Sequence, residues 1–343
     1  MNLARNPRLA VLSLTCLLPL LGACAPPSTD APPRVREEPV TFTNGDVALS
    51  GTLVLPAAAR PVACVVLFHG SGPEPRNLEM ARWFAEQGVA ALTYDKRGVG
   101  GSTGDFRTVP FMDLYLDGLA GVAFLKRRRD IDASRVGVWG LSQGGWLGPL
   151  AASRSNDVAF VIAVSGPGVS PGEQMVFYYA NQLRAEGVPE ADVQAMTMLR
   201  RHVWQSIHDG RDLAVVRSRI EAARAKTAHV PVKAQLDDLS QSTKHAGNLW
   251  IAQEMNYDPV VALRRLKVPI LFLFGEDDRL VPVDDSVRII RDTLTTTHHP
   301  DFTIRTFPGA DHTMHVADAD GSRRHAAEYL SAMRDWLRSR VNR

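Results

Sequence analysis

Short apolar runs alternate with amphipathic segments along most of this chain. The apolar runs are rich in β-branched residues and carry few polar positions, which is typical of strands buried on both faces of a parallel sheet. Asn44-Gly45-Asp46 separates the first two runs and predicts a hairpin turn. The predicted strands cover residues 40–43, 49–55, 63–68, 89–94, 136–139, 160–164, 270–274 and 302–307.

Helical patterns lie between these runs. The predicted helices cover residues 77–86, 111–128, 143–152, 284–293 and 323–340. Strands that alternate with helices predict an α/β protein with a mostly parallel, twisted sheet that helices cover on both faces.

The alternation stops between residues 164 and 269, where no clear strand pattern occurs. The segment is mostly helical in pattern and is far longer than an ordinary loop. We therefore predict a helical cap, over about residues 170–263, inserted into a sheet domain that covers residues 39–343.

The start of the chain has a different character. Arg5 and Arg8 precede an apolar run over residues 9–21 that is too short to span a bilayer, as in an export signal. The run ends in Leu21-Gly22-Ala23-Cys24, which resembles a bacterial lipobox. We expect a signal peptide over residues 1–23, then a lipidated Cys24 that heads a proline-rich tether over residues 24–38.

Lipidation at Cys24 would bind the protein to a membrane of a bacterial cell envelope through an N-terminal lipid anchor. Ala25 after the cysteine favours the outer membrane if the host has two membranes. Ordinary cleavage, which would give a secreted or periplasmic soluble protein, is the alternative.

Charge and cysteine content exclude several function classes. The formal net charge is +2 with scattered Lys and Arg, which argues against a nucleic-acid partner. Cys64 is the one cysteine beyond the N-terminal segment, so no disulfide framework is predicted. His312-x-x-His315 lacks the carboxylate partner of zinc proteases, and we predict neither a metal site nor a cofactor.

One short motif carries chemical meaning because of its setting. Gly140-Leu141-Ser142-Gln143-Gly144 matches G-x-S-x-G between a predicted strand and a predicted helix. A turn of this kind exposes a serine hydroxyl, and its glycines make room for a strained backbone. The helix N-terminus favours negative charge that develops during acyl transfer. We therefore predict Ser142 as a nucleophile.

A serine hydroxyl needs a base, and strand position selects among the ten histidines. Sites in an open parallel sheet form beyond the carboxyl ends of the strands. His312 follows the last strand run, whereas His298 and His299 precede it. We predict His312 as the base, with His315 as its main competitor.

The histidine in turn needs an acid that fixes its orientation. Glu276, Asp277 and Asp278 all follow the preceding strand run, and their position alone does not decide among them.

A glycine-rich turn, His69-Gly70-Ser71-Gly72-Pro73, follows the first buried strand. It can aim backbone N–H groups at an oxyanion, and we expect Ser71 and Gln143 to supply those donors. We expect a structural role for His69. Residues 94–102 end a neighbouring strand and are expected to form a structural wall of the site.

Residues 40–340 resemble the α/β-hydrolase superfamily, in particular the prolyl-oligopeptidase-like and dienelactone-hydrolase-like serine esterases of bacteria. The matching motifs are HGSGP at 69–73, YDKRGVGGS at 94–102, GLSQGG at 140–145, GEDDRLVP at 275–282 and GADH at 309–312. The resemblance implies the α/β-hydrolase fold and, through its G-x-x-D-x-x-V-P pattern, Asp278 as the acid. It also implies oxyanion donors at Ser71 and Gln143. Ser142 stands where dienelactone hydrolases proper have a cysteine, which speaks against that activity.

The resulting hypothesis is a serine esterase that cleaves small-molecule acyl esters through an acyl-enzyme on Ser142, His312 and Asp278. An aminopeptidase, amidase or thioesterase on the same triad is the alternative. An aminopeptidase would need an acidic subsite for the substrate amine, which Glu173 or Glu254 could supply. A catalytically inactive envelope binding protein is the third hypothesis, which the complete triad disfavours. The possible aromatic wall residues of the cap are Phe177, Tyr178, Tyr179, Trp204 and Trp250.

Overall fold

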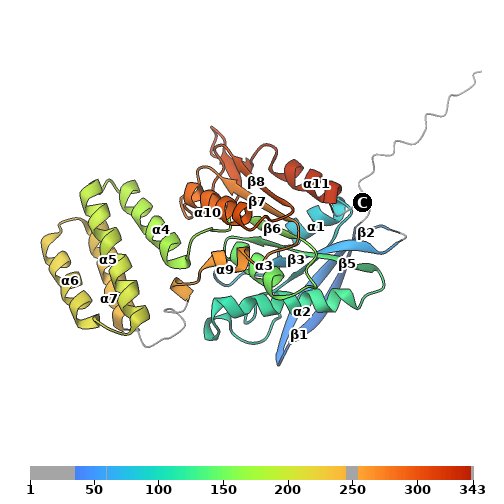
Figure 1. Ribbon diagram of the computed structural model, residues 1–343, viewed down its shortest axis with the longest axis horizontal. Coiled ribbons are helices and arrows are strands. Elements are labelled where there is room, and N and C mark those ends of the chain that lie inside the picture. The colour runs from blue at the N-terminus through green and yellow to red at the C-terminus, as the bar shows by residue number, and fades with distance from the viewer. Residues whose placement is uncertain (1–34, 59, 245–253, 341–343) are drawn as a thin grey trace, which may run out of the picture. The chain divides into compact units, whose positions relative to one another are not determined.

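The computed structural model describes residues 35–58, 60–244 and 254–340, and an eight-stranded sheet forms its centre (Figure 1). The strand order is β1-β2-β4-β3-β5-β6-β7-β8. β2 pairs antiparallel with both β1 and β4, and the pairs from β4 to β8 are parallel. The predicted mostly parallel sheet is thus confirmed. Its strands are β1 (Val35–Asn44), β2 (Val47–Pro56), β3 (Val62–Phe68), β4 (Ala90–Tyr94), β5 (Ile131–Leu141), β6 (Val161–Val164), β7 (Ile270–Gly275) and β8 (Phe302–Phe307).

Helices cover both faces of this sheet, as expected. One face packs against α2 (Tyr115–Lys126), α3 (Gln143–Arg154), α9 (Pro259–Leu263) and α10 (Val283–Thr296). The other face packs against α1 (Leu78–Glu86) and α11 (Tyr329–Arg340). Short 3₁₀ helices at Phe106–Thr108 and Phe111–Leu114 precede α2.

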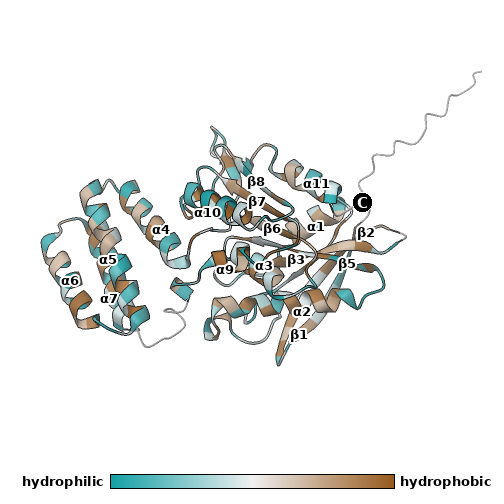
Figure 2. Ribbon diagram, in the orientation of Figure 1, coloured by the Kyte–Doolittle hydropathy of each residue, from teal (hydrophilic) through white to brown (hydrophobic). Residues whose placement is uncertain are grey.

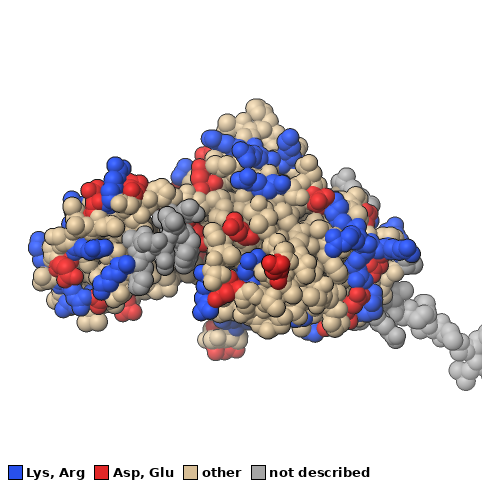
Figure 3. Space-filling model, turned by 90° about the horizontal axis from the view of Figure 1, so that it is seen from below, with Lys and Arg blue, Asp and Glu red and all other residues tan. Residues whose placement is uncertain are grey.

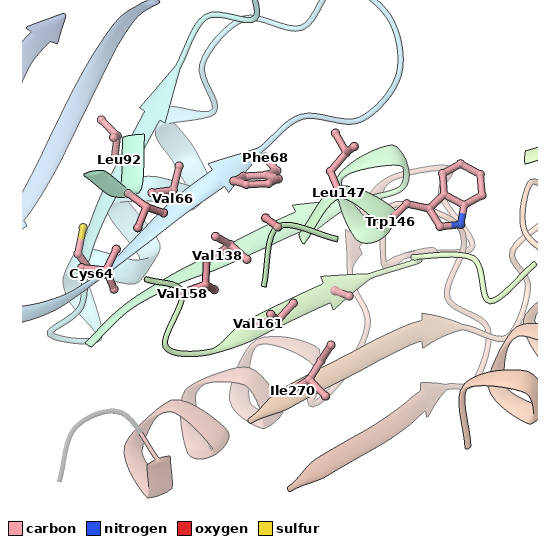
Figure 4. Packing of buried hydrophobic residues seen from close by; sticks show 14 of the residues in the cluster. Cys64, Val66, Phe68, Leu92, Val138, Trp146, Leu147, Val158, Val161 and Ile270 are labelled. Carbon is pink, nitrogen blue, oxygen red and sulfur yellow. The ribbon is translucent and has the colours of Figure 1, made fainter. Parts of the chain in front are cut away.

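The alternation of side chains along β3 explains its continuous apolar sequence. Cys64, Val66 and Phe68 point to one face, where they pack with Leu92 and Val138 (Figure 4). The residues between them pack on the other face, so both faces of the strand are buried. Cys64 is a free, fully buried thiol whose pKa is raised by burial. It behaves as a small hydrophobic side chain, as its sequence setting predicts.

After β6, the described residues up to 244 form four consecutive helices, which we call the helical insertion, and α9 follows closer to β7. The helices of the insertion are α4 (Pro171–Ala185), α5 (Glu190–Asp209), α6 (Leu213–Lys226) and α7 (Val230–Lys244). Their apolar residues, among them Val193, Ile220 and Leu236, form a separate core. Apolar and polar residues alternate along these helices, whereas the central strands are mostly apolar (Figure 2). Acidic and basic side chains both occur on the helical insertion and on the sheet domain (Figure 3).

The prediction of one helix over residues 323–340 is wrong at its start. Arg323–His325 forms strand β10, which pairs antiparallel with β9 (His315–Ala317). Glu328 then adopts a φ of 65°, which a helix cannot contain, and α11 begins only at Tyr329. In the described part of the chain, no helix is both long and apolar enough to cross a bilayer.

Candidate active site

Ser142 stands in a strained turn between β5 and α3. Its φ of 57° and ψ of −114° lie in a region that residues other than glycine rarely adopt. Close backbone packing accounts for the surrounding glycines. A Cβ on Gly140 would lie 2.2 Å from the carbonyl oxygen of Gly144, and a Cβ on Gly145 would lie 2.3 Å from Gly166 Cα. The turn places Ser142 at the carboxyl end of β5, on the wall of a cavity.

Asp278 and His312 form a hydrogen-bonded pair in the loops that follow β7 and β8. The Nδ1 atom of His312 lies 2.7 Å from Oδ2 of Asp278, whose side chain is fully buried. The other oxygen, Oδ1, accepts hydrogen bonds from the N–H groups of Leu280 at 2.7 Å and Val281 at 2.9 Å. Because the carboxylate accepts from Nδ1–H, the Nε2 atom of the ring is left with a free lone pair.

The competing acids and histidine occupy other positions. The two acids that precede Asp278 are exposed. The ring of His315 stacks on the ring of His325 with centroids 4.3 Å apart. The structure therefore brings His312, rather than His315, to the buried carboxylate of Asp278.

The glycine-rich turn after β3 borders the same cavity through Gly70 and Ser71. The N–H group of Gly70 donates to Oε2 of Glu74 at 2.8 Å. His69 lies beneath the turn, with its Nε2 atom 2.6 Å from the carbonyl oxygen of Tyr94. Burial lowers the pKa of His69 to about 4, so the ring is neutral and its Nε2–H donates to that carbonyl.

The cavity has a volume of about 520 Å³ and combines reactive groups with apolar walls. Ser71, Ser142, Gln143 and His312 are among the polar residues that line it. Its apolar and aromatic walls are Phe111, Trp146, Met175, Tyr178, Met255 and Leu280. A cavity of this size, with a few convergent polar groups, is typical of small-molecule sites.

Two glutamates also line the cavity. Burial raises the pKa of Glu254 to about 7, and burial likewise raises the pKa of Glu74. Each carboxyl accepts a backbone N–H: Glu74 from Gly70 and Glu254 from Phe111. These contacts occupy one oxygen of each glutamate. No cluster of metal-ligating side chains occurs within the described ranges.

The other residues that the sequence suggested for the pocket lie apart from it or outside the described residues. Glu173 forms an ion pair with Arg201 in which both side chains are about half exposed. Tyr179 packs its ring against the guanidinium of Arg200, 3.5 Å from the ring centroid. Phe177 lines a different groove, and Trp204 also contacts Arg200. Trp250 and the expected lipidation site Cys24 fall outside the described residues.

Several residues at the site were not found from the sequence. Trp146 follows Ser142 by one helical turn, a spacing that could have placed it beside the nucleophile. Ser165, at the end of β6, donates its hydroxyl to the carbonyl oxygen of His312 at 2.8 Å. Lys96 lies buried behind the Gly70 turn. No local pattern marks Ser165, and the sequence predicts residues 94–102, which contain Lys96, only as a wall of the site. The contacts of both residues come from strands that are distant in sequence.

The chain is similar to a known protein family and to several known proteins. Residues 59–320 match the family model Hydrolase_4, described as serine aminopeptidase, S33. The quorum-quenching protein AidA of Acinetobacter baumannii (strain MDR-ZJ06) is 24% identical over 285 residues, which cover 82% of this chain and 89% of AidA. Esterase EstD of Thermotoga maritima is 25% identical over 260 residues, which cover 72% of this chain and 55% of EstD. Among solved structures, the Pyrococcus furiosus esterase Pf2001 matches with a TM-score of 0.58 at 17% identity, over 89% of this chain and 92% of its own, which shows a shared fold.

Proposed function

We propose that this chain, which belongs to the α/β-hydrolase family described as serine aminopeptidase, S33, hydrolyses small carboxylic esters with Ser142 as the nucleophile. One observation carries the proposal: the strained Ser142 turn and the Asp278–His312 pair meet at a single cavity with apolar walls.

The proposed reaction proceeds through an acyl-enzyme. Ser142 Oγ attacks the ester carbonyl while His312 Nε2 takes its proton, and buried Asp278 stabilises the imidazolium. The N–H groups of Ser71 and Gln143 stabilise the oxyanion of the tetrahedral intermediate. His312 then protonates the departing alcohol. A water molecule, deprotonated by the same histidine, releases the acid and restores Ser142.

The electrostatics of the cavity favour an ester over a substrate with a free amine. An ammonium group would need an ionised carboxylate as its partner. Burial raises the pKa of both Glu74 and Glu254, which disfavours their ionised forms, and one oxygen of each already accepts a backbone N–H. The buried ammonium of Lys96 would repel a second cation. Apolar walls such as Trp146 and Leu280 suit an acyl chain instead.

The proposal is tested with purified wild type and Ser142→Ala on short-chain nitrophenyl esters. We expect the variant to lose roughly 10⁴- to 10⁶-fold in kcat with an unchanged circular dichroism spectrum. A fluorophosphonate should label the wild type at Ser142, as mapped by mass spectrometry. Retention of more than a tenth of wild-type activity by the variant would overturn the assignment. A parallel series of thioesters and aminoacyl anilides tests which class of acyl substrate the enzyme prefers. A higher kcat/KM on the anilides than on the esters would favour the aminopeptidase alternative.

We also propose that Cys24 carries a lipid that anchors the hydrolase to a bacterial membrane, through the lipobox-like Leu21-Gly22-Ala23-Cys24. Stable anchoring takes more than one acyl chain, which bacterial lipoproteins would supply. Wild type should need detergent for release from membranes, and Cys24→Ala should not. Soluble wild type with an unmodified Cys24 would contradict the anchor and leave the catalytic proposal intact.

A further inference from the structure

Lys96 is a buried cation that the proposed reaction does not use directly. It follows Asp95 at the end of β4, and the residue is only 3% exposed. Its ammonium donates to the carbonyl oxygens of Gly70 at 2.8 Å and Gly72 at 3.1 Å, and to Oε1 of Gln143 at 3.1 Å. A buried ammonium is costly unless its three N–H groups are bonded, and these three acceptors match them in number.

The contact with Gly70 fixes the direction of the next N–H group. The Gly70 carbonyl and the Ser71 N–H belong to the same planar trans peptide, in which the two groups point in opposite directions. A bond that holds the carbonyl oxygen toward Lys96 therefore turns the Ser71 N–H away from Lys96.

Glu74 holds the other side of Gly70. Its Oε2 atom accepts the Gly70 N–H at 2.8 Å, and its carbonyl oxygen accepts the N–H of Lys96 at 3.1 Å. A Cβ on Gly70 would lie 2.7 Å from Glu74 Oε1, so the carboxylate packs closely against the turn. Gly70 is thus held by Glu74 at its N–H and by Lys96 at its carbonyl.

The third bond of Lys96 reaches the other side of the proposed oxyanion site. Gln143 follows Ser142, and its N–H is the second expected donor. By binding the Gln143 side chain together with the Gly70 turn, one ammonium ties β4 to the turns that follow β3 and β5.

From this geometry we propose that Lys96 is a positioning residue, whose ammonium orients the Ser71 N–H group toward the oxyanion. The inference rests on the proposed serine-hydrolase function. Lys96 touches no reacting atom in this proposal, and its positive charge adds a favourable field to the site when the oxyanion forms.

This role gives a pH dependence with a defined sign. Burial lowers the pKa of Lys96 to about 8, against the attraction of Glu74, Asp117 and Glu254. The ring of Phe106 lies 5.0 Å from the ammonium, and neutral His69 lies on the side of β3. A deprotonated amine has two N–H groups for three acceptors and no charge. Enzyme-catalysed turnover should therefore fall as the pH rises through about 8.

The test compares Lys96→Met and Lys96→Arg with wild type on a nitrophenyl ester from pH 6 to 10, after subtraction of alkaline hydrolysis. Lys126→Met is the matched control, because Lys126 pairs with Asp157 at the surface. We expect Lys96→Met to lower kcat about 10- to 100-fold, less than direct loss of an oxyanion donor, with KM within about threefold. The Lys96→Met substitution should also remove the fall in turnover near pH 8. Lys96→Arg should retain more activity and move that fall to higher pH.

Two further measurements separate positioning from structure. Fluorophosphonate titration counts folded active sites, and a boronic acid that forms a tetrahedral adduct should bind Lys96→Met more weakly in proportion to kcat. If Lys96→Met does not fold, the pH profile of Lys96→Arg decides. A Lys96→Met enzyme with more than half of the wild-type kcat per titrated site, or with an unchanged pH profile, would overturn the inference. Ser142→Ala in the same assay distinguishes the two proposals: activity without Ser142 removes the proposed function itself.

Discussion

The Nδ1–H group of His312 donates a 2.7 Å hydrogen bond to Oδ2 of Asp278, while the backbone N–H groups of residues 280 and 281 saturate the other carboxylate oxygen. The carboxylate is therefore fixed in one orientation, with no freedom to exchange its two oxygens. This arrangement sets the tautomer of His312. An amide at position 278 would therefore change that tautomer.

We expect Asp278→Asn to lower kcat by about 10³- to 10⁴-fold. The amide oxygen must accept from the backbone N–H groups, so the amide NH₂ would face His312 Nδ1 and force the proton onto Nε2. That ring could no longer accept the serine proton. Asp277→Asn, one residue earlier and exposed, is the control and should stay within about twofold of wild type. A more severe loss in Asp277→Asn would place the acid one residue earlier.

Removal of the two histidines should have opposite consequences. His312→Ala removes the proposed base and should be as damaging to kcat as Ser142→Ala, because triad members act as a unit. A variant that combines Ser142→Ala and His312→Ala should therefore lose no more kcat than either single variant. His315→Ala removes a stacking contact with His325 and a hydrogen bond with the Thr313 hydroxyl, neither of which involves the proposed triad, and should keep most activity. Steady-state kinetics on one nitrophenyl ester compares all four proteins, and an inactive His315→Ala would reverse the assignment.

Much of the fold could be predicted from the sequence because the same pattern recurs along the chain: a continuous apolar run followed by a polar loop. The buried strands read as continuous apolar runs, and Ser142, Asp278 and His312 each follow such a run. Since parallel strands end at the same edge, their loops had to meet there. The neighbourhood of Ser142 and His312 thus followed from strand order, without any knowledge of side-chain geometry.

The role of Lys96 could not be predicted in the same way. Its contacts depend on β3 lying between β4 and β5, with Val66 opposite Leu92 and Phe68 opposite Gly140. Strand register of this kind is not visible in a single sequence. The loop that contains Lys96 was therefore interpreted as a wall of the site. The start of helix α11 was misplaced for a related reason: the β9–β10 pairing is a tertiary contact between two three-residue strands.

Two glycines of α3 should respond differently to alanine. A Cβ on Gly145 would lie 2.3 Å from Gly166 Cα, so Gly145→Ala must displace α3 from the end of β6. We expect a loss of at least about 1–3 kcal/mol in the free energy of unfolding, and slower fluorophosphonate labelling of Ser142. Gly148→Ala is the control, since its Cβ would make ordinary contacts at 3.4 and 3.5 Å and alanine favours a helix. Urea titration checks both, and equal stability of the two variants would contradict this packing.

Glu254 should make the stability of the folded protein depend on pH. Burial raises its pKa in the folded protein to about 7, whereas an unfolded chain has a glutamate pKa of about 4.3. The folded state therefore binds this proton more tightly. The stability that the protonated carboxyl provides is full below the unfolded pKa and is lost as the pH rises through about 7.

Glu254→Gln should remove this dependence, because an amide oxygen can still accept the Phe111 N–H that Glu254 binds. We expect the melting temperature of wild type, relative to this variant, to fall between about pH 5 and pH 8. Glu173→Gln is the matched control on the helical insertion. Glu173 pairs with Arg201 at the surface, so this change should leave the wild-type pH dependence in place. Differential scanning fluorimetry at several pH values measures all three proteins, and parallel curves for wild type and Glu254→Gln would show that the proton on Glu254 does not stabilise the folded site.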